Sequence, residues 1–221
     1  MNIAENIRRI RNEVPAKVEI VAVSKFHPAE MILEAYEAGQ RIFGESRVQE
    51  FLLKQEALPH DIRWHFIGHL QTNKVKAIIG KTAMIESVDS LRLLELINKE
   101  SEKTGVITDL LLQVHVAKEE TKFGFYPEEI REIFNKGIYH SFRSIRMRGL
   151  MGMASNVDDE ERIRSDFMTI HQLYEEIKNN QDLETKHFDC LSMGMSGDWR
   201  LAVDEGSNIV RIGSSIFGSR T

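Results

Sequence analysis

A lysine closes a short apolar run near the N-terminus of the chain. The run covers residues 18–23, is rich in β-branched residues and has the length of a buried strand. Pro28 follows Lys25 by three residues and suits the first turn of a helix, where its missing N–H costs nothing. Lys25 is therefore expected at a strand end, where α/β proteins bind ligands. Beside an apolar wall its amine suits Schiff-base formation with an aldehyde, while a solvated lysine is the commoner explanation of this segment alone.

Two glycine-serine turns near the C-terminus have the composition of an anion site. Ser196-Gly197 precedes a short helix-like segment, and Gly213-Ser214 follows the last apolar run. Hydroxyls and free backbone N–H groups bind anions, and barrels often bind phosphate after their last two strands. A phosphate cup and a pair of ordinary tight turns explain these segments equally well. Arg211 alternates with apolar neighbours, so its side chain is expected to point away from theirs, toward the mouth of a barrel.

Other residues that ligate or react give weaker signals. His65 and His69 have the spacing of a helical metal pair, but their segment reads as a strand followed by a glycine. No third ligand is evident nearby in the sequence, so we predict no metal site. Glu45 follows a strand-like run and is either a carboxylate of the site or a helix cap. Cys190 resembles a small core residue rather than a nucleophile.

These groups meet only if the fold brings strand ends together. Strand-like runs alternate with amphipathic, helix-like segments from end to end. The pattern predicts strands at 18–23, 41–43, 63–67, 84–85, 109–116, 145–150, 188–191 and 208–212. It predicts helices at 1–12, 29–38, 46–56, 90–103, 128–136, 158–179 and 198–205. Asp89 or Ser90 is expected to cap one helix and Asp158 another, and Gly39 and Gly137 are expected to be left-handed after helix ends.

Strands that alternate with helices imply parallel pairing through crossover connections. A closed (β/α)8 barrel with an extra N-terminal helix and an open doubly wound sheet both fit this order. The barrel is favoured because no linker, repeat or low-complexity segment divides the chain. No Gly-x-Gly-x-x-Gly motif follows the first strand, which argues against a dinucleotide-binding sheet. We therefore predict a single domain over residues 1–221.

Composition narrows the class of protein. The chain has 221 residues, 42% of them hydrophobic and 29% charged, as in a globular protein with a real core. Its net charge of −5 and lack of a basic block argue against a broad nucleic-acid surface. One cysteine excludes an internal disulfide framework, which favours a reducing compartment. The polar N-terminus and the absence of a bilayer-length apolar stretch favour a soluble, cytoplasmic protein without a membrane partner.

Taken together, segments along nearly the whole chain resemble the YggS/PROSC-type pyridoxal phosphate homeostasis proteins. The Trp-His-Phe-Ile-Gly-x-Leu-Gln-x-Asn-Lys run at 64–74 is highly specific, as is Ser-Met-Gly-Met-Ser at 192–196 followed by Arg-Ile-Gly at 211–213. The remaining matches lie at 21–25, 43–45, 48–50, 122–125 and 148–151. The chain departs from the family at Ser46-Arg47, where Asn-Tyr is usual, and at Gly152-Met153, where a threonine is common.

The resemblance implies a single fold-type III barrel like the N-terminal domain of alanine racemase, with pyridoxal 5′-phosphate as its cofactor. It implies a Schiff base on Lys25 and a pyridine nitrogen that faces Arg211. It places the phosphate on the late turns, at Ser196, Gly197, Gly213 and Ser214. It places further cofactor contacts at Ser46, Ile67 and Met193. A guanidinium keeps its proton, so Arg211 can only donate to the nitrogen, and the ring is then a poorer electron sink than a pyridinium.

The function expected from this resemblance is binding and hand-over of pyridoxal phosphate, in vitamin B6 homeostasis and amino-acid balance, without robust catalysis. A racemase needs a second acid or base opposite the lysine, and the four tyrosines all fall in or beside helix-like segments. The chain is expected to end without the C-terminal β domain of the racemases, which favours a monomer. A weak pyridoxal-phosphate racemase or lyase is the alternative, and a scaffold that contacts apo pyridoxal-phosphate enzymes is the third possibility.

Overall fold

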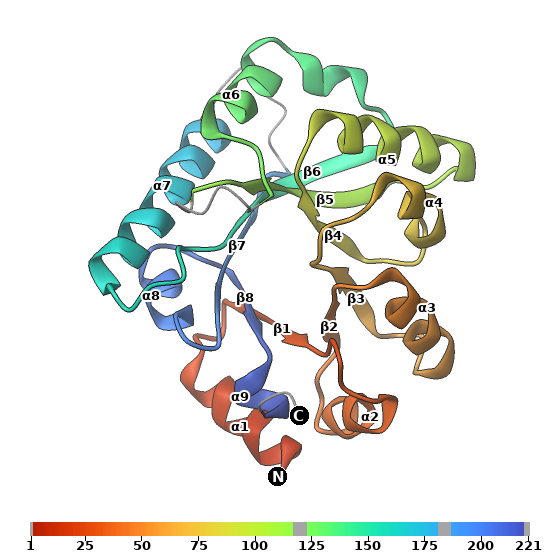
Figure 1. The fold of residues 1–221 in the computed structure, drawn as a ribbon, viewed down its shortest axis with the longest axis vertical. Coiled ribbons are helices and arrows are strands. Elements are labelled where there is room, and N and C mark those ends of the chain that lie inside the picture. Colours follow the sequence, from red (N-terminus) through yellow and green to blue (C-terminus); the bar gives the residue numbers. More distant parts are fainter. Residues whose placement is uncertain (1, 117–122, 181–186, 219–221) are drawn as a thin grey trace.

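The computed structural model describes residues 2–116, 123–180 and 187–218, so Met1 and Lys122 of the segments above lie outside it. The described residues form a closed barrel of parallel strands in chain order, with β8 paired to β1 and the helices around the outside (Figure 1). The predicted (β/α)8 barrel is confirmed. The strands are β1 (Glu19–Val23), β2 (Ile42–Glu45), β3 (Arg63–Phe66), β4 (Met84–Val88), β5 (Thr108–Val114), β6 (Ile145–Gly152), β7 (Cys190–Met195) and β8 (Ile209–Ile212).

The helices predicted from the sequence are all present among the described residues. They are α1 (Ile3–Glu13), α2 (Ala29–Glu37), α3 (Val48–Ala57), α5 (Leu91–Thr104), α6 (Pro127–Asn135), α7 (Glu160–Lys178) and α8 (Trp199–Asp204). Two α-helices of four residues each, α4 (Val75–Ile78) and α9 (Ser214–Phe217), were not predicted, nor were the 3-10 turns η1 (Thr72–Lys74) and η2 (Ile138–Ser141). Elements this short hold one helical turn and show no periodicity in the sequence.

Helix ends follow the predicted capping with one shift. Ser90 caps α5, and its Oγ accepts the Leu93 N–H at 3.4 Å. Asp159, and not Asp158, caps α7 by accepting from two backbone N–H groups of the first turn. Gly39 and Gly137 both have positive φ, as predicted.

Strands β4 and β7 extend beyond their predicted ends. The apolar pattern ends at residues 85 and 191, because Glu86 and Ser192, which follow, are polar. Both side chains are fully buried inside the fold and hydrogen-bond to each other at 2.6 Å. The partner that satisfies each polar group comes from a distant strand, so the short-range pattern gave no sign that the strand continues.

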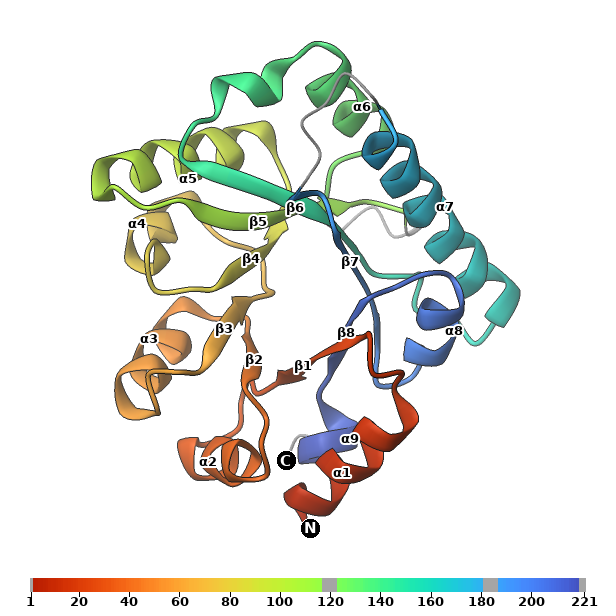
Figure 2. The same ribbon diagram turned by 180° about the vertical axis from the view of Figure 1, so that it is seen from behind.

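The first helix ties the two ends of the described chain together. It buries Ile3, Ile7 and Ile10, a spacing that gives α1 one apolar face. Each such side chain contributes about 1.5–3 kcal/mol by leaving water. Helix α1 packs against α2 and α9 and lies beside α9 in both views (Figures 1 and 2). The Asn6 side-chain amide also donates to the Ile216 carbonyl at 2.9 Å, so α1 fixes the segment that follows the last strand.

Two apolar clusters form the core. The larger lies between the strands and the surrounding helices. The smaller fills the barrel interior on the side of the N-terminal strand ends, with one side chain from most strands: Val21, Ile42, Met84, Leu111, Met151, Cys190 and Ile209. Because strand side chains alternate, the residue two positions later on each strand faces the same interior, one layer nearer the C-terminal strand ends. That layer forms the floor of the site described below.

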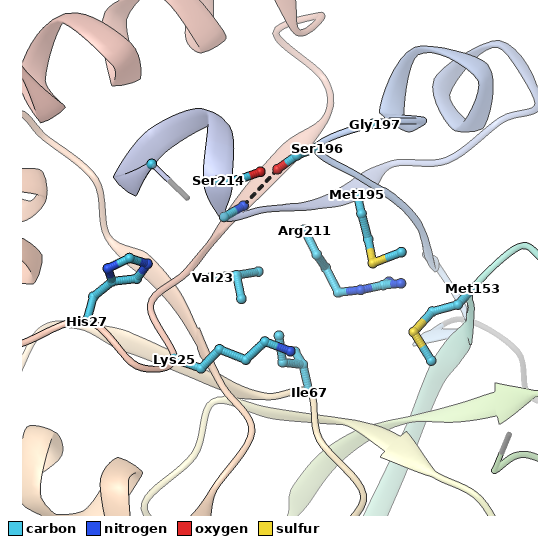
Figure 3. A pocket seen from close by; sticks show the side chains of 12 residues that line it. Val23, Lys25, His27, Ile67, Met153, Met195, Ser196, Gly197, Arg211 and Ser214 are labelled. Carbon is cyan, nitrogen blue, oxygen red and sulfur yellow. Dashed lines mark hydrogen bonds between the residues drawn. The ribbon is translucent and has the colours of Figure 1, made fainter. Parts of the chain in front are cut away.

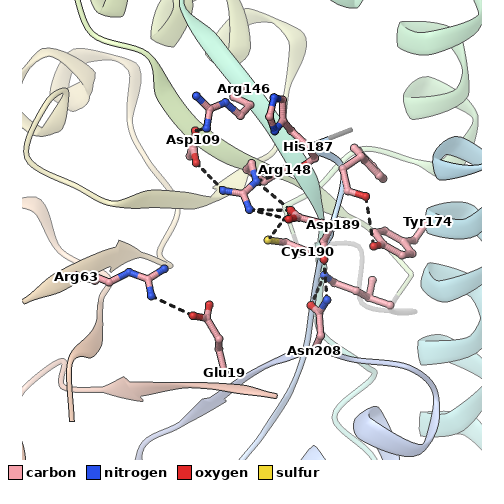
Figure 4. Close-up of polar contacts among 12 residues, drawn as sticks. Glu19, Arg63, Asp109, Arg146, Arg148, Tyr174, His187, Asp189, Cys190 and Asn208 are labelled. Carbon is pink, nitrogen blue, oxygen red and sulfur yellow. Dashed lines mark hydrogen bonds and ion pairs between the residues drawn. The ribbon is translucent and has the colours of Figure 1, made fainter. Parts of the chain in front are cut away.

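The N-terminal ends of the strands carry two separate groups of ion pairs (Figure 4). Arg148 donates to Asp109 at 2.7 Å and to both carboxylate oxygens of Asp189 at 2.8 and 2.9 Å. Arg63 pairs with Glu19 at 3.0 Å. This face lies opposite the strand ends that bind ligands in barrels, so we assign these ion pairs to stability.

The thiol of Cys190 is expected to be inert in the folded protein. Burial, together with the adjacent Asp189 carboxylate, raises the pKa of Cys190 to about 12. At pH 8 about one thiol in ten thousand is then a thiolate, the reactive form. Iodoacetamide should leave folded protein unlabelled over an hour and label it fully in guanidinium chloride. Complete labelling of folded protein within minutes would contradict this burial.

None of the helices in the described ranges has both the length and the hydropathy of a bilayer-spanning segment.

Candidate functional site

A cavity of about 460 Å³ opens at the C-terminal ends of the strands (Figure 3). Its volume is in the range of pockets that hold small molecules and cofactors. Two cationic side chains, Lys25 and Arg211, extend into it, and no carboxylate is among the described lining residues. The lining residues are Val23, Lys25, His27, Ile67, Met153, Met195, Ser196, Gly197, Arg211, Gly213, Ser214 and Gly218. The chemistry of this lining favours an anionic ligand with an apolar body.

Lys25 lies in a strained turn between β1 and α2. Phe26, the next residue, has a φ of +69° and is the one non-glycine residue in the described ranges with positive φ. Such a conformation costs about 1–2 kcal/mol for an L-residue and persists only where the surroundings hold it. The Phe26 N–H donates to Glu50 Oε1 at 2.6 Å, and Ser24 N–H on the other side donates to the Gly44 carbonyl at 3.0 Å. Lys25 is thus placed between two clamped neighbours.

A buried lysine behind this turn holds the clamp together. Lys54 Nζ donates to the Ser24 carbonyl at 2.8 Å, to Glu45 Oε1 at 2.8 Å and to Glu50 Oε1 at 2.6 Å. Three acceptors satisfy all three protons of its ammonium group. Helix α3 places Glu50 and Lys54 one turn apart on the same face. We call Glu45, Glu50 and Lys54 the turn anchor, because together they bind the backbone on both sides of Lys25.

Glu45 has neither of the two roles considered from the sequence. A Cβ on Gly44 would meet Val21 and Ile67 inside the barrel, so the next side chain along β2 points outward. There Glu45 is fully buried and accepts from Lys54 and from Ser24 Oγ at 2.6 Å. Burial raises the pKa of Glu45, and the hydrogen bonds from Lys54 and Ser24 oppose that rise. Glu45 therefore supports the lysine turn from outside the barrel.

The two late turns are joined to each other. Ser196 Oγ accepts the Gly213 N–H at 3.1 Å and the Ser215 N–H at 3.5 Å, as Figure 3 shows for the first. Gly194 lets β7 run close to α8, because its φ is +91° and a Cβ there would lie 2.6 Å from Ala202 Cβ. The predicted pair of turns thus forms one continuous wall of hydroxyls and backbone, and Ser196 and Ser214 lie together on it (Figure 3).

Arg211 forms the floor of the cavity from β8. Its guanidinium is buried, with NH1 donating to the Ser192 carbonyl at 2.9 Å and NH2 to the Gly152 carbonyl at 2.8 Å. Burial lowers the pKa of Arg211, and the Glu86 and Asp198 carboxylates oppose this. A guanidinium stays protonated in proteins even so. Its charge and donors are therefore fixed in direction at the bottom of the pocket.

Seven of the nine residues expected to touch a cofactor line the cavity: Lys25, Ile67, Ser196, Gly197, Arg211, Gly213 and Ser214. Ser46 and Met193 are not among the lining residues. The backbone of Ser46 packs over Gly68, where a Cβ would lie 2.3 Å from the Ser46 carbonyl oxygen. Met193 points to the other side of β7, into the core beneath the helices. We leave both out of the proposed site.

Five lining residues were missed from the sequence: Val23, His27, Met153, Met195 and Gly218. Val23 lies two positions before Lys25, a step that the strand alternation could have revealed. His27 stacks on Phe217 of α9 with ring centroids 5.0 Å apart, a contact between the two ends of the chain that no local pattern shows.

Gly152 and Arg47, where the chain departs from the family pattern, each have a defined neighbour in the structure. At Gly152, a Cβ would lie 2.2 Å from Ile170 Cδ1, so threonine would require Ile170 of α7 to move. Arg47 covers the ring of the strained Phe26, with its guanidinium carbon 4.5 Å from the ring centroid.

The two histidines of the 64–74 segment do not share a site. His65 Nδ1 lies 2.6 Å from Glu86 Oε1 inside the barrel, and His69 Nδ1 lies 2.6 Å from Asp89 Oδ2 in a more exposed position. His69 also stacks on Phe123 at a centroid distance of 3.7 Å. Each ring is thus held by its own carboxylate.

Known proteins match most or all of the chain. The family model described as "Alanine racemase, N-terminal domain" matches residues 1–221. A pyridoxal phosphate homeostasis protein of Aquifex aeolicus is 38% identical over 231 residues, covering 100% of this chain and 99% of the relative. A protein of the same name from Helicobacter pylori is 42% identical over 202 residues, covering 90% of this chain and 87% of the relative.

Solved structures agree with these matches. PipY of Synechococcus elongatus without PLP superposes with a TM-score of 0.91 at 37% identity, covering 98% of this chain and 100% of PipY. The structure of PipY with PLP bound gives a TM-score of 0.88 at 36% identity, with the same coverage. An alanine racemase of Clostridium difficile shares the fold at 16% identity and a TM-score of 0.78, with 56% of that chain covered. The chain belongs to the alanine racemase N-terminal domain family and, within it, groups with the pyridoxal phosphate homeostasis proteins.

Proposed function

We propose that this protein binds pyridoxal 5′-phosphate as a Schiff base on Lys25, and holds and delivers it without robust catalysis. The observation that carries the proposal is the cavity itself, with Lys25 on one side and the joined late turns on another. The names of its relatives and the PLP-bound structure of PipY support the same cofactor. Vitamin B6 homeostasis and amino-acid balance are the proposed roles, carried out by a cytoplasmic monomer.

The lining fits each chemical part of this cofactor. Bound pyridoxal phosphate supplies an aldehyde that condenses with a primary amine, and the side chain of Lys25 carries that amine. The hydroxyls of Ser196 and Ser214, with the open space at Gly197, suit its phosphate, because a Cβ on Gly197 would meet nothing within 4 Å. Val23, Ile67 and Met153 give an apolar surface for the ring. Arg211 offers a guanidinium donor to the ring nitrogen.

The side chains of this site bind and orient better than they transfer protons. Arg211 keeps its proton and donates a hydrogen bond to the pyridine nitrogen, so that nitrogen stays unprotonated. An unprotonated ring is a poorer electron sink, which disfavours carbanion chemistry. The described lining contains no tyrosine or cysteine. Among the described lining residues, His27 is the one besides Lys25 suited to general-base work, and it supports the alternative of a weak racemase or lyase. Robust α-proton exchange in alanine or serine that disappears in Lys25→Ala would favour that alternative over a carrier.

Apo pyridoxal-phosphate enzymes are the proposed acceptors. The loaded protein, freed of unbound cofactor, is mixed with an apo aminotransferase in the presence of an excess aldehyde trap such as a hydrazine. We expect acceptor activity to appear faster than the trap collects cofactor, because delivery passes through direct contact. An equal concentration of free pyridoxal phosphate is the control, and the trap should consume it first. If the trap blocks both equally, the protein only stores the cofactor.

A further inference from the structure

A chain of buried polar side chains crosses the barrel beneath the cavity. His65 on β3 meets Glu86 on β4 at 2.6 Å, and Glu86 Oε2 accepts from Ser192 Oγ on β7 at 2.6 Å. Ser192 Oγ in turn lies 2.5 Å from NH1 of Arg211 on β8. All four side chains are at most 4% exposed. Barrel interiors are usually filled by branched aliphatic residues, so four polar groups in this layer call for a reason.

Glu86 is the anion of this buried network. Burial would raise the pKa of Glu86, but its hydrogen bond with His65 and the charges around it bring the pKa below its ordinary value. Glu86 is therefore a carboxylate. An acceptor-only carboxylate needs a proton on His65 Nδ1, which leaves Nε2 as the second ring nitrogen.

The state of His65 Nε2 decides what balances Glu86. This atom is buried and has no hydrogen-bond partner among the described residues. A cationic His65 would bury an N–H without an acceptor, at a cost larger than that of an unused lone pair on the neutral ring. The described surroundings of His65 offer no acceptor for a proton on Nε2, so the geometry points to the other cation near Glu86 as the group that balances its charge.

Arg211 is the cation in position to do so. Its NH1 lies 3.8 Å from Glu86 Oε2, and its other described bonds go to uncharged groups, the Ser192 and Gly152 carbonyls and the Ser192 hydroxyl. Asp198 also favours the charged form of Arg211, but less strongly than Glu86 does. Asp198 is itself bound to the Met195 N–H at 2.6 Å in the turn above.

We propose that Glu86 is the positioning and charge-balancing residue of Arg211, and so sets the charge that the cavity floor presents to a bound cofactor. Ser192 bridges the pair, and His65 holds Glu86 in place from the neighbouring strand β3. The first part concerns the protein alone. The second part, which involves the cofactor ring, rests on the proposed function.

A double-mutant cycle in cofactor-free protein tests the first part. The variants are Glu86→Gln, Arg211→Gln and the double variant, compared by thermal unfolding. Each single change leaves one buried charge unbalanced, whereas the double change leaves two neutral amides of similar shape. The double variant should therefore melt above both single variants. A double variant that loses the sum of the two single losses would show that Glu86 does not balance Arg211.

The absorbance of loaded protein tests the second part. In Glu86→Gln the guanidinium charge is uncompensated, which disfavours a second positive charge on the protonated Schiff base nearby. The pKa of that chromophore should fall by about one unit, a tenfold change in its proton affinity. Ser192→Ala is the matched control, because it removes the bridge and keeps both charges, and it should shift the pKa by less than a third as much.

The outcomes separate the two parts. An equal shift in both variants would mean that packing, and not charge, sets the spectrum, and would overturn the second part. Coupling in the cycle with no shift in Glu86→Gln would place the cofactor ring away from Arg211, against the proposed site, and would leave the Glu86–Arg211 assignment standing. If Glu86→Gln alone does not fold, the Schiff-base pKa of Arg211→Gln is compared with that of the double variant. The pKa should be lower in the double variant, because the negative charge of Glu86 is missing there.

Discussion

Lys25→Ala is expected to lose all covalent attachment of pyridoxal phosphate, together with the visible absorbance of the loaded protein. The amine at the end of β1 is removed, while the hydroxyls of Ser196 and Ser214 and the apolar lining stay in place. Binding should persist through the phosphate but weaken about a hundredfold or more, roughly 2.7 kcal/mol. Equilibrium dialysis measures the affinity, and a spectrum of the same sample measures the attachment.

Lys103→Ala is the control for this change. Lys103 lies in the last turn of α5, where it is exposed and pairs with Glu100 on the surface. It should load and colour like the unmodified protein. A Lys25→Ala protein that is still coloured and still resists dialysis as the unmodified protein does would show that the aldehyde is held elsewhere.

Lys54→Met is expected to have the largest effect on stability. The change leaves two carboxylates, Glu45 and Glu50, without their cation in a place where Glu45 is fully buried. Breaking a buried pair in this way costs about 3–5 kcal/mol. For a chain of this size the melting temperature should fall by on the order of 10 °C. Because the turn anchor also holds Phe26, the variant should form its Schiff base more slowly as well.

The chain contains a matched control for Lys54→Met. Lys136 makes the same one-turn pair with Glu132, at 3.0 Å, but both side chains are 63% exposed. Exposed pairs contribute little, so Lys136→Met should change stability by less than about 0.5 kcal/mol. Equal losses in the two variants would mean that burial of the turn anchor contributes nothing, and that the strained turn is held by other contacts.

The barrel was predictable because its information is local. Most strands contain a short β-branched or apolar run, and most long helices carry an apolar face, so order and type follow from neighbouring residues. The errors fall where the deciding contacts are distant. Strand β7 continues through Ser192 because Glu86, 106 residues away in sequence, accepts its hydroxyl proton. A sequence window around Ser192 holds no trace of that partner.

The residues of the site also divide into those that the local sequence predicts and those that depend on distant contacts. Lys25 and Arg211 could be found because strand ends and strand alternation place them, and the resemblance to a family selected the chemistry. Glu45 and Lys54 were not assigned to the turn anchor, because a buried ion pair behind a strand looks like surface charge in the sequence. Met193 was expected at the cofactor from the resemblance alone, and its side chain packs in the larger core cluster, outside the described lining of the cavity.

Reduction and peptide mapping test the central claim most directly. The protein is loaded with pyridoxal phosphate, treated with borohydride to fix the Schiff base, digested and examined by mass spectrometry. The account predicts one phosphopyridoxyl adduct, on the peptide that contains Lys25, and unmodified peptides for Lys54 and Lys74. An adduct chiefly on another lysine, or none at all after loading, would contradict the assignment of this cavity as the cofactor site.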